Sequence, residues 1–276
     1  MLEVDYKKYC VSRYLEVYET VKKSLKKGAE AERVAQKEAI KVTVIESLEK
    51  YPKTESSLIW QSIYAAHVSR KSGICDPNVI SAVISADNSW KKSSGHAFEE
   101  AVEQLANKAL AGTGVEMILQ RGLSKMIQQN LIFNESRDMK WLKEQLNSSN
   151  FDLYMLVKKD GKSMVFGCVQ TKTSVRDRVT RDREPSIHAM AAFFWSTAFV
   201  LDGAFLKLPK FQFMVNGGSP SFPSNGWNGC YVFSEQYSLD RIYYIGENQK
   251  TFADHATRAA TAWLAQRQWI DINWKA

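Results

Sequence analysis

The stretch FDLYMLVKKDGKSMVFGCVQTK, residues 151–172, carries the clearest fold signal in the chain. Two apolar segments flank the sequence KDG at 159–161, where glycine supplies the positive φ that a tight hairpin turn requires. We therefore predict one strand over 151–158 and a second over 163–173. Because side chains alternate across a strand, one face of the second strand is expected to carry Phe166, Cys168, Gln170 and Lys172.

The sequence on either side of this hairpin predicts two regions of different character. Apolar residues over 1–90 recur at steps of three and four, which indicates an all-helical N-terminal domain. Helical and strand-like segments mix over 91–276, which indicates a second domain built on a sheet. The predicted fold class is α/β: a mixed sheet flanked by helices, preceded by a helical region.

Further elements are predicted within the second domain. A proline in its first turn favours an apolar helix from Glu184 to about Leu201, and residues 117–130 also have a helical pattern. Additional strands are expected at 211–215, 230–233 and 242–245.

Composition excludes several classes of protein. The chain is 45% hydrophobic and 24% charged, as soluble globular domains are. No apolar run is long enough to span a bilayer, and the N-terminus lacks a signal-peptide pattern. The 4 cysteines form no CxxC pair, which excludes a zinc ribbon or finger and favours a reducing cytoplasm.

Two residues of the hairpin suggest phosphodiester hydrolysis. Asp152 begins the first strand and Lys172 lies near the end of the second, so pairing of the strands can bring them together. This reaction needs a carboxylate for a divalent ion, a cation near the attacking water and usually a second carboxylate. Gln170 stands where that second acid is often found and carries no charge, whereas Glu184, at a predicted helix start, could supply it.

Arginine and aspartate alternate shortly after Lys172. The two triplets are Arg176-Asp177-Arg178 and Arg181-Asp182-Arg183. Arginine can donate to guanine N7 and O6 while aspartate accepts from cytosine N4, so the pattern suits adjacent G·C pairs in the major groove. The net charge of +7 is consistent with a polyanionic partner. A salt-bridged solvent-exposed surface explains this segment alone equally well.

These motifs together resemble the signature of restriction endonucleases that recognise CCGG or CCNGG. The matching residues are Asp152, QTK at 170–172, the first RDR triplet and Glu184. In this family a rearranged PD-(D/E)xK site takes its second acid from the helix after the xK strand, which accounts for Gln170. The resemblance covers roughly residues 92–200, and Phe151 stands where the family has proline.

The resemblance implies a restriction-endonuclease-like fold and a type II restriction endonuclease that requires Mg²⁺. It implies that Asp152 and Glu184 bind the metal ion and that Lys172 assists the attacking water. The segment GHAFEE, residues 95–100, is similar to the family helix that contributes an early acid. Glu99 is the expected catalytic residue there.

Two further glutamates, Glu100 and Glu103, compete with Glu99 for this role. For DNA recognition, the resemblance implies that Arg176, Asp177 and Arg178 read bases. Arg181 and Arg183 of the second triplet are expected to contact the DNA backbone.

The same resemblance implies the substrate and partners. We expect double-strand cuts at a palindromic site with a CCGG core, leaving four-base 5′ overhangs with 5′-phosphates. The chain length and helical N-terminal region resemble a member that cuts W/CCGGW. A homodimer or larger homo-oligomer, a cognate DNA methyltransferase, a bacterial cytoplasmic location and no membrane are implied. The alternatives are a non-catalytic sequence-specific DNA-binding protein and an interaction scaffold.

Overall fold

The computed structural model describes residues 3–25, 28–174, 179–233, 239–245, 249–265 and 273–275. The chain divides into two compact units, Met1–Lys91 and Lys92–Ala276. The first is helical and the second is a mixed sheet flanked by helices, which confirms the predicted fold class. Within the described ranges, no helix is long and apolar enough to cross a membrane.

In the described part of the N-terminal unit, three helices and the first part of a fourth form the fold. They are α1 (Glu3–Ser24), α2 (Ala29–Lys50), α3 (Ser56–Ser72) and α4 (Pro77–Ala109), the last of which continues into the second unit. The core pairs large residues with small ones, because buried tyrosines of α1 (Tyr14 and Tyr18 among them) pack with Ala35 and Ala39 of α2. Close packing of alanine against aromatic rings lets the helices approach each other.

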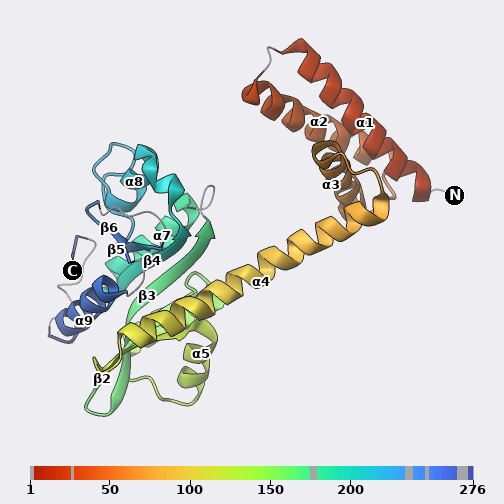
Figure 1. The fold of residues 1–276 in the computed structure, drawn as a ribbon. Helices are drawn as coiled ribbons and strands as arrows, with labels where there is room; N and C mark the ends of the chain where they lie inside the picture. The colour runs from red at the N-terminus through yellow and green to blue at the C-terminus, as the bar shows by residue number, and fades with distance from the viewer. Residues whose placement is uncertain are drawn as a thin grey trace. The chain divides into compact units, whose positions relative to one another are not determined.

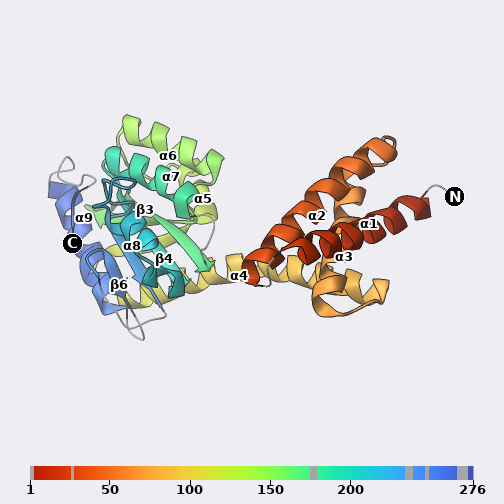
Figure 2. The ribbon, with the colours of Figure 1, turned by 90° about the horizontal axis from the view of Figure 1, so that it is seen from above.

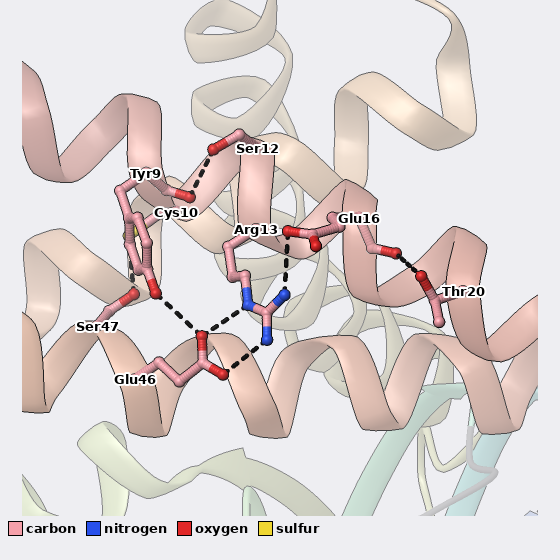
Figure 3. A network of polar contacts seen from close by, with 8 residues as sticks. All are labelled: Tyr9, Cys10, Ser12, Arg13, Glu16, Thr20, Glu46 and Ser47. Atoms are coloured by element: carbon pink, nitrogen blue, oxygen red, sulfur yellow. Dashed lines mark hydrogen bonds and ion pairs between the residues drawn. The ribbon is translucent and has the colours of Figure 1, made fainter.

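A polar network joins α1 and α2 outside this core (Figure 3). The Arg13 guanidinium donates two hydrogen bonds to the Glu46 carboxylate, at 2.6 and 2.7 Å, and the Tyr9 hydroxyl donates a third at 2.9 Å. The hydrogen bonds from Arg13 and Tyr9 lower the pKa of Glu46 to about 2. The ionised carboxylate therefore helps to fix how these two helices pair.

The second unit contains a six-stranded sheet with strand order β1-β2-β3-β4-β5-β6. The strands are β1 (Val115–Leu119), β2 (Leu153–Lys159), β3 (Lys162–Ser174), β4 (Trp195–Asp202), β5 (Gly229–Val232) and β6 (Ile242–Tyr244). Pairing is antiparallel from β1 to β3 and parallel from β3 to β6. At the β2–β3 turn, Asp160 and Gly161 both have positive φ, 50° and 72°, as a tight hairpin requires.

Helices cover both faces of this sheet. The second part of α4 and α9 (Lys250–Ala265) contribute to one core with residues of β1 to β5. The opposite face carries α5 (Gln120–Gln128), α6 (Ser136–Ser148), α7 (Val179–Ala191), η1 (Ala204–Lys207) and α8 (Pro209–Asn216). Figure 2 shows α5, α6 and α7 on one side of the sheet and α4 on the other, and Figure 1 shows the end of α4 near α9.

The structure corrects several sequence predictions. The predicted helix from Glu184 to Leu201 is α7 followed by the buried strand β4, and the predicted strand at 211–215 lies within α8. Within the predicted helix 117–130, residues up to Leu119 belong to β1.

One predicted strand face is also wrong. The β2–β3 register shifts between Met155 and Leu156, which pair with Gly167 and Val165, so Phe166 is an extra residue in β3. This bulge turns Phe166 into the core beneath α4, whereas Cys168 packs on the opposite face.

Candidate active site at the start of β2 and the end of β3

Asp152 precedes β2 and its carboxylate is held against β3. The Thr171 backbone N–H donates to Asp152 Oδ2 at 2.6 Å, and the Thr171 hydroxyl donates to the same oxygen at 3.1 Å. The Asp152 main chain is fixed as well, because its N–H donates to Val169 and its carbonyl accepts from Gln120. In the described part of the chain, the side-chain hydrogen bonds of Asp152 use Oδ2, so Oδ1 is available to a ligand.

Lys172 lies one residue further along β3 and pairs with an acid of α7. Its Nζ lies 3.4 Å from Asp182 Oδ2, and the two side chains are 27% and 17% exposed. The ammonium group is therefore partly accessible. An ion pair in this position restricts where a long and flexible lysine side chain can point.

Glu99, on α4, is the third charged group near Asp152. Burial raises the pKa of the Glu99 carboxyl, and the Asp152 charge raises it further. A hydrogen bond with His96 and the charge of Lys172 lower it, although they do not cancel the increase. The charges of Asp152 and Lys172 therefore both shift the pKa of Glu99, which lies on a different element of the fold.

The two competing glutamates have other partners. Glu103 accepts a hydrogen bond from the Leu119 N–H at 2.9 Å, which ties α4 to the end of β1. Glu100 pairs with Arg121 of α5 at 2.7 Å. Of the three glutamates, Glu99 is therefore the one that the described contacts place in the electrostatic environment of Asp152.

Gln170 occupies the position where the sequence suggested a missing acid. It is buried, and its amide nitrogen donates to the carbonyl oxygens of Asn150 at 3.1 Å and Asp182 at 3.0 Å. Its Oε1 accepts a hydrogen bond from Trp227 Nε1 at 2.8 Å. Sequence reasoning gave these interactions no role, since Asn150 and Trp227 lie 20 and 57 residues away.

Glu184 is not brought to this group. α7 begins at Val179 and packs its buried side, which includes Ser186 and Ala189, against the sheet. A step of two residues turns a helix by roughly 200°, so Glu184 lies on the side away from Ser186 and is exposed. The predicted metal-binding role of Glu184 stays a prediction, and Asp182 is the acid of α7 that faces Lys172.

One arginine of the second triplet, Arg183, makes contacts within the protein. Arg183 donates hydrogen bonds to the carbonyl oxygens of Met214, at 3.2 Å, and Ser224, and its guanidinium lies over the Phe222 ring. Burial lowers the pKa of Arg183. These contacts join α7 to α8 and the loop that follows, and the predicted DNA-backbone role of Arg183 stays a prediction.

The other predicted recognition residues are placed differently. Arg181 is exposed at the first turn of α7. The first triplet, Arg176, Asp177 and Arg178, lies outside the described residues. Its predicted base-reading role stays a prediction.

The donors of the site suit a divalent cation only in part. Asp152 and Glu99 supply two carboxylates from separate elements, and hard cations such as Mg²⁺ prefer oxygen ligands. Within the ranges that the structure describes, no three His, Cys, Asp or Glu side chains form a ready-made metal cluster. The described residues therefore supply two carboxylates, and water and a phosphate oxygen can complete the coordination of a Mg²⁺ ion.

Comparisons with known proteins identify the family. The sequence model described as "BsaWI restriction endonuclease type 2" matches residues 132–269. The protein chain in a crystal structure of the pre-specific complex of restriction endonuclease BsaWI with DNA is 51% identical to this chain. The match covers 98% of each chain, with a TM-score of 0.81. A specific AgeI–DNA complex is 14% identical, covers 92% of this chain and 91% of its own, and has a TM-score of 0.43.

The search of curated proteins found no match. The family model and the BsaWI structure are together sufficient for the assignment, and they agree with the α/β fold described above. The chain belongs to the BsaWI family of restriction endonucleases and is a type II site-specific deoxyribonuclease.

Proposed function

We propose that this enzyme makes Mg²⁺-dependent double-strand cuts in DNA at a palindromic site with a CCGG core. W/CCGGW is the first site to test, and the proposed products carry four-base 5′ overhangs with 5′-phosphates. The observation that supports a hydrolytic site most strongly is the convergence of three charged residues from separate elements. They are Glu99 of α4, Asp152 before β2 and Lys172 of β3.

Each of the three has a proposed task. Asp152, through Oδ1, and Glu99 would hold the metal ion, since their carboxylates are close enough to raise the pKa of Glu99. A bound Mg²⁺ ion polarises a phosphoryl oxygen and lowers the pKa of coordinated water. Lys172 orients the attacking water and offsets the negative charge that develops on the phosphate.

We propose that Asp182 is the acid of α7 that acts in this site, a place that the resemblance gave to Glu184. Its carboxylate lies 3.4 Å from Lys172 and holds the ammonium group near the end of β3. Two buried cysteines, Cys168 and Cys230, are not proposed as nucleophiles. Burial raises the pKa of Cys168 and of Cys230, so both thiols stay protonated at neutral pH.

DNA recognition is proposed for the first triplet, Arg176, Asp177 and Arg178, with Arg181 on the DNA backbone. Support comes from the hydrogen-bonding pattern of G·C pairs and from the exposed position of Arg181. The DNA in the BsaWI complex supports the same class of ligand.

We also propose a homodimer or larger homo-oligomer, since a palindrome presents equivalent strands about a two-fold axis. The helical unit 1–91 would help to hold this assembly. A cognate DNA methyltransferase would protect the genome of the bacterial host, and the reaction would take place in the cytoplasm.

The test is digestion of a plasmid that carries one W/CCGGW site, with Mg²⁺ and with EDTA. Linear product only with Mg²⁺ is the expected result, and a plasmid without the site is the control. Asp152→Asn and Lys172→Ala should bind the site and leave it intact. Cutting in EDTA would contradict the metal requirement, and normal cutting by either variant would move the active site elsewhere.

A further inference from the structure

Gln170 connects three segments that are distant in the sequence. All polar atoms of its side-chain amide are used: Nε2 donates to Asn150 and Asp182, and Oε1 accepts from Trp227. Gln170 is 2% exposed, so its hydrogen bonds are made with the protein and lie away from bulk solvent. Such a fully paired buried amide fixes its neighbours because breaking any one bond leaves a polar group unsatisfied.

The chemistry of the partners requires an amide. Both Asn150 and Asp182 present carbonyl oxygens, which only accept hydrogen bonds, and the amide NH₂ group supplies two donors. An ionised carboxylate at this position would supply none and would face two carbonyl oxygens. Glutamine at residue 170 therefore satisfies a geometric requirement that the acid of a common metal site cannot satisfy.

The three connections reach groups of the proposed active site. Asn150 lies two residues before Asp152, and Asp182 is the residue whose carboxylate pairs with Lys172. Gln170 itself lies two residues before Lys172 on β3. A cavity of about 30 Å³ beside it is lined by Lys172, Asp182 and Trp227 among other residues. A shorter side chain at 170 would enlarge this cavity and let α7 shift.

We propose that Gln170 is a positioning residue, which acts through Asp152 and Asp182 to fix the geometry around Lys172. This proposal rests on the proposed active site. The hydrogen bond from Gln170 to the Asp182 carbonyl oxygen holds the first turn of α7 against β3. The second donated bond holds the chain that leads into Asp152.

The test uses the full-length enzyme with Gln170→Glu and Gln170→Met, which keep the length of the side chain. The control is Gln128→Glu, an exposed change at the end of α5. Single-turnover cleavage and affinity for cognate DNA without Mg²⁺ are measured on protein shown to be folded by circular dichroism. We expect cleavage at least about 10-fold slower for both variants. We expect DNA affinity to stay close to that of the wild type, because Gln170 is buried and does not itself face the DNA.

A double-mutant cycle with Asp182→Asn separates positioning from general destabilisation. If Gln170 acts through Asp182, adding Gln170→Met to Asp182→Asn should slow cleavage less than it slows the wild type. Additive effects would overturn the role through Asp182, and a wild-type cleavage rate in folded Gln170→Met would overturn the whole proposal. If neither Gln170 variant folds, Trp227→Phe removes one bond and keeps a ring. A cleavage rate reduced at least about 3-fold then supports the proposal and an unchanged rate overturns it.

Failure of the positioning role of Gln170 can be told apart from failure of the active-site assignment. Normal cleavage by Asp152→Asn or Lys172→Ala would refute the assignment itself. Loss of cleavage in those two variants with normal cleavage in folded Gln170 variants would refute only the positioning role.

Discussion

Glu99 is held in an environment that disfavours its charge, because burial and the nearby Asp152 both raise the pKa of its carboxyl. An acid whose pKa is raised on folding binds its proton more tightly in the folded chain. Its ionised form therefore costs stability at neutral pH, and this cost shrinks as the pH falls below the raised pKa and is gone below the ordinary value of 4.5. A divalent cation between the two carboxylates would offset the same cost.

We predict that Glu99→Gln cuts DNA roughly 10²- to 10³-fold more slowly than wild type. Without metal at neutral pH, the same variant should unfold at a higher temperature, because the burial of a charged carboxylate and its repulsion by Asp152 are both removed. Added Mg²⁺ should raise the unfolding temperature of the wild type more than that of the variant. Cleavage assays and differential scanning fluorimetry measure these effects.

Glu100→Gln is the matched control, since Glu100 pairs with Arg121 at the surface. It should leave cleavage and the response to Mg²⁺ unchanged. A Glu99→Gln enzyme that is less stable, or that cuts normally, would remove Glu99 from the proposed metal site.

The two arginines that flank Asp182 should behave differently. Arg183→Ala removes hydrogen bonds to two carbonyl oxygens and should lower the free energy of unfolding by about 2 kcal/mol, measured in urea. Arg181→Ala should keep stability and weaken binding to all DNA sequences alike. Its slope of log affinity against log salt should fall by about 1. Interchanged results would give the DNA-backbone role to Arg183 in place of Arg181.

Sequence reasoning reached part of the candidate site and missed another part for a physical reason. A hairpin fixes which residues lie side by side, so Asp152 and the end of β3 could be placed together. The choice between Asp182 and Glu184 depends on where α7 begins. The sequence suggested a helix start at Glu184, whereas the helix begins at Val179, and this changes which acid faces Lys172.

At the scale of elements, the pairing of α1 and α2 should depend on pH. Hydrogen bonds from Arg13 and Tyr9 lower the pKa of Glu46 from 4.5 to about 2. Its contribution to stability is therefore complete above about pH 4.5 and is lost as the pH falls toward 2.

The corresponding measurement is thermal unfolding of wild type and Glu46→Gln between pH 6 and pH 2. The wild type should be more stable at pH 6, and the difference should shrink as the pH falls. Glu16→Gln on α1 is the control, because Arg13 pairs with Glu16 at a more exposed site. A difference independent of pH would contradict the account of this network.

The sheet shows which elements a sequence specifies poorly. β4 lies between two parallel neighbours and its first six residues are all buried, so its sequence lacks the alternation of a half-exposed strand and also suits a buried helix. The boundary between α7 and β4 lies at Phe193, whose φ of 65° is incompatible with a continuing helix. By contrast, the β2–β3 hairpin was predictable because its turn residues carry a local signal.

At the scale of the whole molecule, the symmetry of a palindromic site requires matched catalytic groups on both strands. One chain holds one such set, so we predict two subunits on each cognate site. Light scattering of the full-length chain with a cognate duplex should give the mass of a dimer or larger assembly on DNA. A chain starting at Lys92 should assemble less well if the helical unit contributes. A monomer that makes clean double-strand breaks would contradict the symmetry argument.

The central claim is that the enzyme cuts within DNA sites with a CCGG core, and sequencing of fragment ends tests it most directly. Plasmid DNA is digested with Mg²⁺, and both strands of the resulting ends are sequenced through ligated adaptors. The account predicts four-base 5′-CCGG overhangs with 5′-phosphates, flanked by A or T, and no ends when Asp152→Asn replaces the wild type. Ends at unrelated sequences, or blunt or 3′-extended ends, would contradict it.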